Sequence, residues 1–234
     1  MPETAVITGA STGIGKSLAW QLADAGYRLV LAARSEDKLQ AIAKEIQQKG
    51  GESLPVPTDV SQSEQIKTLK EKALDFGNVS VVVNNAGTGK FSNIENVTLA
   101  DWNRQIDVNL RASFLVSQAF IPHMKQKKKG SLIFINSVAG KKGYAYSAAY
   151  VASKFGLRGL AESLREELRE DNIKVVSIYP GAVDTPFWDD IQSDFPRKEM
   201  LNSDALAESI VHTIQAAGNF TVEEMVVRRT AGDF

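Results

Sequence analysis

Two patterns of hydrophobic and polar positions alternate along this chain. Short apolar runs are separated by longer segments in which apolar residues recur every three or four positions. The first pattern is typical of buried strands and the second of amphipathic helices. The apolar runs predict strands at 5–8, 28–33, 52–57, 79–84, 131–136, 174–179 and 223–227. The periodic segments predict helices at 13–25, 35–49, 61–76, 99–127, 148–171 and 203–217.

The order of these elements predicts an α/β fold. Two central strands, 79–83 and 131–135, are apolar along nearly their whole length, as expected where helices cover both faces of a sheet. Strands that alternate with helices form parallel sheets through right-handed crossovers. We therefore expect a Rossmann-type, doubly wound parallel sheet of about seven strands flanked by helices. No linker or repeat interrupts the 234 residues, so residues 1–234 are predicted to form a single dinucleotide-binding domain.

A glycine-rich turn follows the first predicted strand and leads directly into the first helix. It reads Thr8-Gly9-Ala10-Ser11-Thr12-Gly13-Ile14-Gly15. Glycine allows the backbone angles and the close approach by which helix N-terminal amides hold a pyrophosphate. The spacing G-x-x-x-G-x-G differs from the more familiar G-x-G-x-x-G. The alternative is an ordinary strand-to-helix loop, but the position at the start of a βαβ unit favours phosphate binding.

The residues that end the second strand indicate which dinucleotide binds. NAD enzymes usually carry an acidic residue there, whereas this chain has Arg34 and Ser35. A guanidinium forms a fork with a phosphate, and Ser35, Ser11 and Thr12 offer further donors. The alternative is a solvated Arg34 beside an N-cap serine. The pattern predicts NADP(H) as the cofactor.

A second candidate site lies in the middle of the chain. Tyr150 and Lys154 are separated by one helical turn, and Ser137 precedes the tyrosine by thirteen residues at the end of an apolar strand. A free tyrosine has a pKa of about 10, and a nearby ammonium lowers that pKa. The hydroxyl of Tyr150 would then exchange a proton with a carbonyl or alcohol, while Ser137 holds the substrate oxygen and Lys154 also binds a ribose. A Tyr-x-x-x-Lys pair alone is common on protein surfaces.

The composition of the chain argues against several other kinds of function. The formal net charge is −1, so no overall field attracts nucleic acid or an anionic membrane. There is no cysteine and there are only two histidines, His123 and His212, which argues against disulfides, thiolate nucleophiles and a metal site. The lysine-rich segment 125–130 is interpreted as a helix C-terminus ended by Gly130. With no leader sequence and no membrane-spanning run visible, a cytoplasmic location is expected.

Six motifs in order identify a family resemblance. The chain resembles the single-domain short-chain dehydrogenases/reductases over essentially its whole length. The motifs are the glycine turn 8–15, Asp59-Val60, Asn84-Asn85-Ala86-Gly87, Asn109, Ser137 with Tyr150 and Lys154, and Pro180-Gly181-Ala182-Val183-Asp184-Thr185.

The resemblance implies further roles. Asp59 and Val60 would contact the adenine, and Asn109 would hold a water that links Lys154 to solvent. From the residues alone, Asp59 is equally a turn residue before an N-cap at Ser61. Asn85, Ala86 and Gly87 would line the adenosine side. The nicotinamide end would be bound by Pro180, Gly181, Val183 and Thr185, of which Pro180-Gly181 alone also reads as a plain turn.

The chain departs from the family pattern in two places. Thr12 replaces the lysine or arginine that many NADP-using members carry in the glycine turn, so cofactor selection rests mainly on Arg34. The ending 222–230 lacks the glycine-rich C-terminus of 3-oxoacyl-carrier-protein reductases. It looks more like the branch that oxidises serine and 3-hydroxy acids.

The segment of about 186–200 is interpreted as a lid over the substrate. It carries Phe187 and Trp188, and Tyr144 would form part of the opposite wall. These aromatic residues suit a medium-sized ketone or aldehyde. The alternative is a plain surface helix and loop.

The predicted function is hydride transfer between NADP(H) and a carbonyl or secondary alcohol, with Tyr150 as general acid or base. The alternative is a non-catalytic protein that senses NADP(H), and a third option, an epimerase or dehydratase, needs a larger C-terminal region. Small residues on the Tyr150 helix, Ala152, Gly156 and Gly159, together with the resemblance, predict a homodimer or homotetramer. Burial of these residues within one subunit would also explain them.

Overall fold

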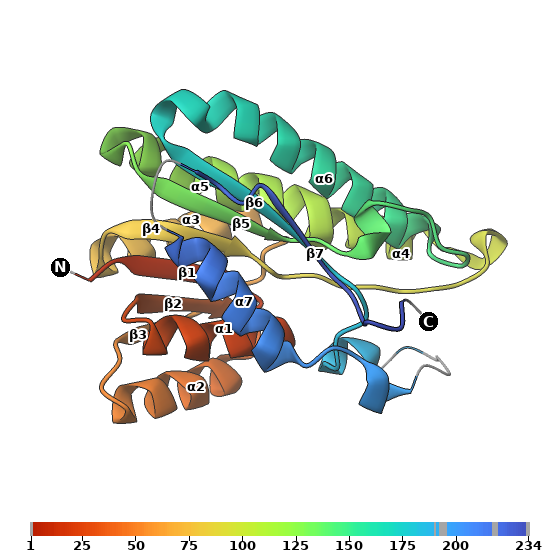
Figure 1. Ribbon diagram of the computed structural model, residues 1–234, viewed down its shortest axis with the longest axis horizontal. Helices are drawn as coiled ribbons and strands as arrows, with labels where there is room; N and C mark the ends of the chain where they lie inside the picture. Colours follow the sequence, from red (N-terminus) through yellow and green to blue (C-terminus); the bar gives the residue numbers. More distant parts are fainter. Residues whose placement is uncertain (1, 190, 192–195, 217–219, 233–234) are drawn as a thin grey trace.

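The computed structural model describes residues 2–189, 191, 196–216 and 220–232. Within them, seven strands form one sheet in the order β3-β2-β1-β4-β5-β6-β7, and every neighbouring pair is parallel (Figure 1). The strands are β1 (Thr4–Thr8), β2 (Arg28–Ala33), β3 (Ser53–Pro57), β4 (Val79–Asn84), β5 (Gly130–Ile135), β6 (Ile173–Pro180) and β7 (Glu224–Val227). The doubly wound parallel sheet predicted from the sequence is confirmed.

Helices cover both faces of this sheet (Figure 1). One core lies between the sheet and α1, α2 and α7, and the other between the sheet and α3, α5 and α6. Alternate residues of one strand enter different cores, as Ile7 and Val6 of β1 do, because successive side chains point to opposite faces. The helices are α1 (Gly13–Asp24), α2 (Glu36–Gln48), α3 (Ser63–Phe76), α4 (Leu99–Ile106), α5 (Ala112–Lys127), α6 (Ala148–Leu168) and α7 (Ser203–Gln215).

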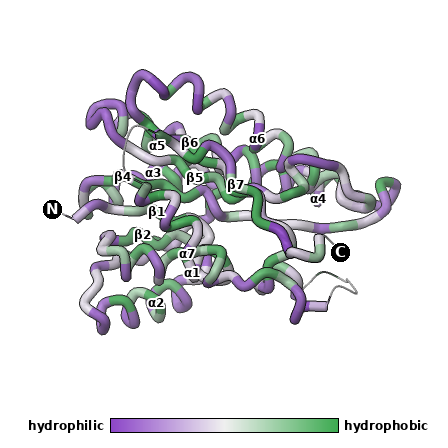
Figure 2. Tube along the Cα trace, viewed as in Figure 1, coloured by the Kyte–Doolittle hydropathy of each residue, from purple (hydrophilic) through white to green (hydrophobic). Residues whose placement is uncertain are grey.

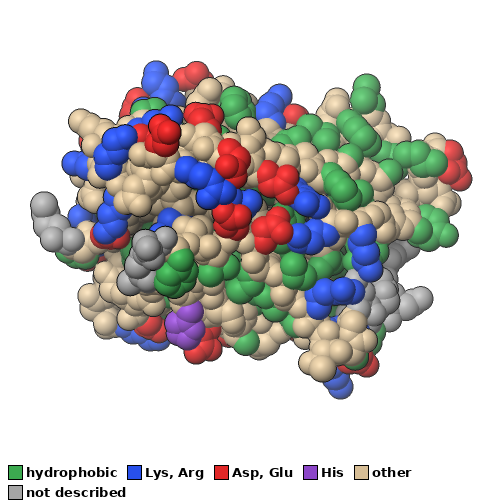
Figure 3. All heavy atoms as spheres, turned by 45° about the horizontal axis from the view of Figure 1, so that its top comes forward, with side chains coloured by type: hydrophobic (Ala, Val, Ile, Leu, Met, Phe, Trp, Pro, Cys, Tyr) green, Lys and Arg blue, Asp and Glu red, His purple; other side chains and the backbone are tan. Residues whose placement is uncertain are grey.

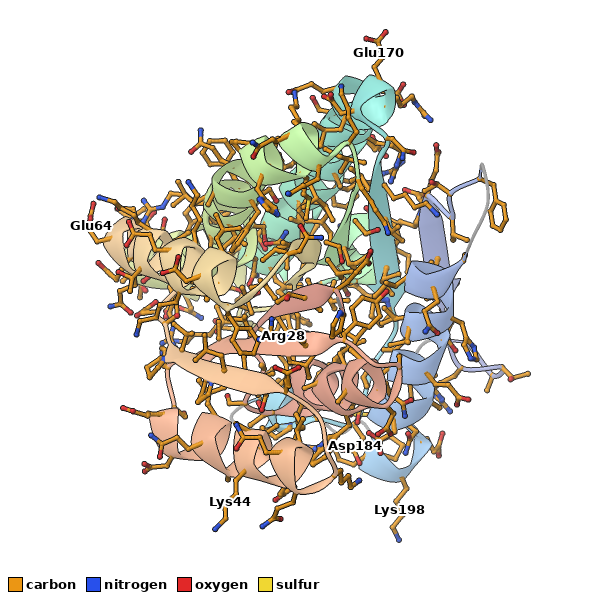
Figure 4. The ribbon with its side chains drawn as sticks, turned by 90° about the vertical axis from the view of Figure 1, so that its left-hand side faces the viewer. Arg28, Lys44, Glu64, Glu170, Asp184 and Lys198 are labelled. Carbon is orange, nitrogen blue, oxygen red and sulfur yellow. The ribbon has the colours of Figure 1, made fainter. Side chains whose placement is uncertain are left out.

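The distribution of polarity follows from this layering. The strands at the centre are the most hydrophobic part of the trace, and the helices alternate between polar and apolar positions (Figure 2). Lys44, Glu64, Glu170 and Lys198 extend outward from the body of the molecule (Figure 4). None of the described helices is both long enough and apolar enough to cross a bilayer.

The segment predicted as one helix over 99–127 is continuous but not uniform. A π-helical segment, Asp107–Arg111, separates α4 from α5 and carries the buried Asn109. Such an insertion widens one turn and often lies at a functional site. Periodicity alone did not predict it, because one extra residue in a turn barely changes the spacing of apolar positions.

The end of α5 corrects one prediction. Lys128, not Gly130, ends the helix, and it does so in the left-handed conformation with φ 49°. Gly130 instead begins β5, where an added Cβ would lie 2.5 Å from the Met124 sulfur. The glycine is needed for packing between α5 and β5 rather than for helix termination.

The strand order reverses between β1 and β4. Connections from these two strands leave toward opposite faces of the sheet, which opens a crevice at their carboxyl ends. The glycine turn after β1 and the loop after β4 both lie at this point, so the fold brings two of the sequence motifs together.

Candidate active site

The glycine turn is folded tightly against the start of α1. Gly9 and Gly13 have φ of +66° and +53°, values that side chains rarely allow. An added Cβ at Gly15 would lie 2.3 Å from the Gly9 carbonyl oxygen. Thr12 is the N-cap residue of α1, but its side chain makes no capping hydrogen bond. The first amides of α1 therefore remain suited to an anionic ligand.

Thr8 and Asn85 connect the two strands at the switch point. The Thr8 hydroxyl donates to the Val83 carbonyl at 3.2 Å and accepts from the amides of Asn85 and Ala86 at 3.0 and 3.1 Å. The Asn85 side-chain amide donates to the carbonyl oxygens of Thr8 and Gly9 at 2.9 and 3.2 Å. Asn85, predicted to line the adenosine side, also holds the glycine turn. Thr8 belongs to the glycine turn 8–15, but the sequence predicted no role for its side chain.

One cavity of about 1430 Å³ runs along the carboxyl edge of the sheet. Most residues singled out in the sequence line it, from segments as far apart as the glycine turn and the loop after β6. They are Gly9, Ser11, Thr12, Gly13, Ile14, Arg34, Ser35, Asp59, Val60, Asn85, Ala86, Gly87, Ser137, Tyr144, Tyr150, Lys154, Pro180, Gly181, Val183, Thr185, Phe187 and Trp188. Gly15 and Asn109 are the exceptions and lie behind its wall.

Two arginines lie beside Asp59 at one end of the cavity. A hydrogen bond from the Ser61 hydroxyl holds the pKa of the Asp59 carboxyl below its usual range against the effect of burial, and the charges of Arg34 and Arg104 act in the same direction. Arg34 is exposed, and the Ser35 side chain makes no cap for α2. This end is therefore cationic on balance and offers hydroxyl donors, which suits a phosphate next to an adenosine.

Asp59 also closes the turn that precedes α3. Its Oδ1 accepts from the Ser61 amide and hydroxyl at 2.9 and 2.7 Å. The N-cap position of α3 is Gln62 rather than Ser61. The turn interpretation of Asp59 is thus correct, while its proposed contact with adenine stays a prediction.

Tyr150 and Lys154 lie on one face at the start of α6. The side chain of Asn136, at the end of β5, ties this helix to the sheet. Its Nδ2 donates to the Lys154 carbonyl at 3.1 Å and its Oδ1 accepts from the Ser137 amide at 2.9 Å. Ser137 and Tyr150 line the same cavity, and the Ser137 side chain acts on the pKa of the Tyr150 phenol. Asn136 was not predicted as a site residue, although its position directly before Ser137 at a strand end was a usable signal.

The electrostatics of this pair differ from the expectation. Burial raises the pKa of Tyr150 to about 12, and the side chain of Ser137 opposes that rise. Burial also lowers the pKa of Lys154 to about 8. The predicted lowering of the Tyr150 pKa by the Lys154 ammonium is absent. The physical reason is that the ammonium donates to the Ile135 carbonyl at 3.0 Å and lies 5.7 Å from the centre of the Tyr150 ring.

Asn109 lies at the back of the catalytic group. It is fully buried, accepts from the Thr88 amide at 2.8 Å, and donates to the Thr88 carbonyl and the Ser153 hydroxyl at 2.9 Å each. These bonds join the loop after β4 to α6. An added Cβ on Gly87 would lie 3.5 Å from Asn109 Oδ1 and 3.9 Å from Lys154 Nζ. The water-holding role stays a prediction.

The described parts of the predicted lid are held by one arginine. Residues Pro186–Trp188 and Arg197–Glu199 form short 3₁₀ turns, while 190 and 192–195 lie outside the described residues. The Arg197 guanidinium donates to Asp184 at 2.6 Å, to Asp189 at 3.0 Å and to the Thr185 carbonyl at 2.9 Å. These bonds tie Arg197 to the segment that carries the cavity-lining Phe187 and Trp188. The lid role itself stays a prediction.

Phe91 is a cavity residue that the sequence analysis missed. It lies in the loop after β4 and its ring approaches those of Tyr150, Phe187 and Trp188. Its signal was an aromatic residue shortly after the Asn-Asn-Ala-Gly motif. Tyr144, expected on the opposite wall, does line the cavity.

The donors present fit a phosphorylated dinucleotide. The cavity combines a glycine cradle that a Cβ would fill, an uncapped helix N-terminus and a cationic end. The described residues contain no group of three or more histidine, cysteine, aspartate or glutamate side chains arranged to hold a metal ion. The cavity lining does include a hydroxyl, a phenol and an ammonium, from Ser137, Tyr150 and Lys154.

Comparisons with known proteins support this interpretation. The sequence profile described as short chain dehydrogenase matches residues 3–195. Sepiapterin reductase of Chlorobaculum tepidum is 32% identical over 241 residues, which cover 100% of this chain and 98% of that protein. An alcohol dehydrogenase from the archaeon Thermococcus sibiricus, solved with 5-hydroxy-NADP, is 33% identical with a TM-score of 0.91 over 98% of this chain and 97% of that one. A metagenomic short-chain oxidoreductase, solved with NADP, is 37% identical with a TM-score of 0.86 over 97% of each chain.

Proposed function

Because the chain belongs to the short-chain dehydrogenase/reductase family of oxidoreductases, we propose that it transfers a hydride between NADP(H) and a carbonyl or secondary alcohol. One observation carries this proposal: Ser137, Tyr150 and Lys154 line the same cavity as the glycine turn. A proton-transferring phenol thus faces the space in which a dinucleotide fits.

Preference for NADP(H) over NAD(H) rests on Arg34. This arginine directly follows β2, where an NAD enzyme usually has an acid, and it lines the cavity with Ser35 and Ser11. Related structures from Thermococcus sibiricus and from a metagenome were solved with 5-hydroxy-NADP and NADP, which is consistent with this assignment.

Ser137, Tyr150 and Lys154 have different roles in the proposed reduction of a carbonyl. Bound NADPH supplies the hydride, and Ser137 orients the carbonyl oxygen toward the phenol. Tyr150 gives its proton to that oxygen as negative charge develops on it. A phenol with a pKa of about 12 keeps its proton at neutral pH and is therefore ready to act as the acid in reduction. The Lys154 ammonium, which lines the same cavity, binds the ribose.

The competing function is a protein that senses NADP(H) without catalysis. Such a protein needs the glycine turn and Arg34 but has no use for a serine, a phenol and an ammonium held together. The presence of Ser137, Tyr150 and Lys154 in one cavity and the anchoring of Lys154 by Ile135 favour catalysis.

The test is consumption of NADPH with ketones, quinones, 3-oxoacyl thioesters and 3-oxo acids, followed by absorbance. Tyr150→Phe is the control, because it keeps the ring and removes the proton donor. We expect turnover to fall roughly 10²–10⁴-fold while NADPH binding, followed by fluorescence, is retained. Wild-type turnover in the variant would show that the acid is wrongly assigned, and binding without any turnover in the wild type would favour the sensor.

A homodimer or homotetramer is proposed from the apolar surface. Leu99, Phe114 and Phe155 are 73%, 43% and 42% exposed, and Figure 3 shows apolar side chains gathered at the end that carries α4 and the start of α6. An added Cβ on Gly159 would have no neighbour within 4 Å, whereas one on Gly156 would meet Leu110 of the same subunit. Gly159 thus leaves room for a second copy. Light scattering at micromolar concentration tests this, and a clean monomer would contradict it. Cytoplasmic location likewise stays a prediction.

A further inference from the structure

Two loops meet over the Tyr150 ring through aromatic side chains. The centre of the Phe91 ring lies 5.5 Å from that of Tyr150 in an edge-to-face arrangement, and the centre of the Phe187 ring lies 5.9 Å from it. Phe187 also packs on Gly89, where an added Cβ would lie 2.5 Å from the Phe187 Cζ. Only a residue without a side chain at position 89 lets the two loops approach this closely.

Trp188 completes the group and is held in place by its one polar atom. Its indole nitrogen donates to the Val183 carbonyl at 3.1 Å. Its ring lies 5.5 Å from Phe187 and is nearly parallel to Phe91, with 6.3 Å between centres and 26° between planes. We call Phe91, Tyr150, Phe187 and Trp188 the aromatic group. It presents ring faces and edges, rather than polar atoms, around the phenol.

The lysines and arginines that line the cavity outside its Asp59 end already have polar partners. The Lys154 ammonium donates to the Ile135 carbonyl at 3.0 Å. Lys90 Nζ lies 2.8 Å from Asp101, and Arg229 forms an ion pair with Glu199. Arg34 and Arg104 lie at the other end, beside Asp59. An anionic substrate beside the aromatic group would therefore have to draw one of these side chains away from its present partner.

We propose that this protein selects uncharged carbonyl compounds whose carbonyl carbon is bonded to a planar aromatic group, and that Phe91 sets this selectivity. The proposal rests on the reductase function proposed above and deepens it. It also opposes the 3-hydroxy-acid branch suggested by the C-terminal segment, since those substrates carry a carboxylate.

The position of the reacting oxygen decides where the substituent lies. A carbonyl oxygen bonded to the Tyr150 phenol and to Ser137 leaves its neighbouring group beside the Tyr150 ring, where Phe91 and Phe187 stand. Reduction places the hydride of NADPH on the carbonyl carbon and the Tyr150 proton on the oxygen, so the products are the alcohol and NADP⁺. A flat ring makes edge-to-face or offset contacts with these side chains that a saturated ring does not make.

The experiment compares three 2-oxo compounds that differ in one feature each. Ethyl phenylglyoxylate carries a phenyl group, ethyl cyclohexylglyoxylate carries a saturated ring of the same size, and phenylglyoxylate carries a free carboxylate. The rate at which borohydride reduces each compound is used to correct its enzymatic rate for the intrinsic reactivity of its carbonyl group. For the wild type we expect the corrected kcat/KM of the phenyl ester to exceed that of each of the other two compounds by roughly tenfold. Over the cyclohexyl ester, a factor of roughly ten is what one to two favourable ring contacts contribute.

Variants at position 91 assign the selectivity. Phe91→Leu is expected to bring the ratio of phenyl to cyclohexyl ester close to one, and Phe91→Tyr to restore it, because the ring returns. Phe220→Leu, an exposed aromatic residue outside the cavity, is the matched control and is expected to keep the wild-type ratio. NADPH fluorescence and circular dichroism establish that each variant is folded.

The outcomes separate this inference from the function on which it rests. Equal corrected rates for the two esters, preference for the free acid, or an unchanged ratio in Phe91→Leu would overturn the selectivity while leaving the reductase function in place. Failure of the wild type to oxidise NADPH with any carbonyl in the wider panel, despite binding it, would overturn the reductase function and the selectivity with it.

Discussion

Lys154 and Tyr150 share one face of α6, yet the Lys154 ammonium donates to the Ile135 carbonyl and lies 5.7 Å from the centre of the Tyr150 ring. The side chain that acts on the pKa of the phenol is Ser137 instead. Burial therefore acts on both groups, keeping the phenol protonated and making the ammonium easier to deprotonate. This division leads to predictions that separate the roles of the two residues.

The pH dependence of carbonyl reduction is expected to report Lys154 rather than Tyr150. The acid form of Tyr150 persists below its pKa of about 12, so it does not limit reduction at ordinary pH. Lys154 loses its charge as pH rises through its pKa of about 8, and kcat/KM for reduction should fall through that range. Oxidation of the alcohol needs the phenolate and should have the opposite slope, rising with pH. Initial rates in both directions between about pH 6 and 10 test this, and a reduction rate that is flat across the range would contradict it.

Replacement of Ser137 by alanine removes the hydroxyl that we propose holds the substrate oxygen beside the phenol. We expect kcat to fall roughly 10²–10³-fold, as when one donor to a developing oxyanion is lost, with little change in the affinity for NADPH. Ser137→Thr keeps a hydroxyl and should recover part of the rate. Steady-state kinetics on both variants would refute the assignment if alanine and threonine behaved alike.

Arg34→Asp should reverse the cofactor preference. A charged hydrogen bond contributes about 1.5–3 kcal/mol, so the KM for NADPH should rise roughly 10–100-fold while that for NADH falls or stays constant. Arg104→Gln is the matched control, since this second arginine also acts on Asp59 but comes from α4 rather than from the end of β2. It should change the KM values for the two cofactors by similar factors. A wild type that used NADH as well as NADPH would contradict the assignment of Arg34.

Thr8→Val should destabilise the fold at the switch point. The substitution keeps the shape of a residue that is 2% exposed but leaves the amides of Asn85 and Ala86 without their acceptor. We expect the free energy of unfolding in urea to fall by about 1–3 kcal/mol. Thr68→Val, whose exposed hydroxyl donates only to the Glu64 carbonyl, should change it by less than about 0.5 kcal/mol. Equal effects of the two substitutions would show that the contacts of Thr8 with the loop after β4 contribute nothing to the free energy of unfolding.

Much of the fold followed from local pattern. Apolar runs and helical periodicity depend only on nearby residues, so the predicted elements agree closely with the described ones. The misses were the π-helical segment around Asn109 and the helix end at Lys128, where one residue's conformation departs from what its neighbours favour. The glycine turn was equally accessible, because positive φ at Gly9 and Gly13 is a property of that short segment.

The sequence by itself determined the α/β class, the glycine turn before α1, the position of Arg34 after β2 and the spacing of one helical turn between Tyr150 and Lys154. Only the tertiary structure decided that Lys154 bonds to Ile135, that Thr8 and Asn85 join two strands, and that Phe91 meets Phe187 over the phenol. The reason is physical: these contacts join residues that are distant along the chain, and the hydrogen bonds, burial and ring geometry that define them exist only once the strands and loops are packed together.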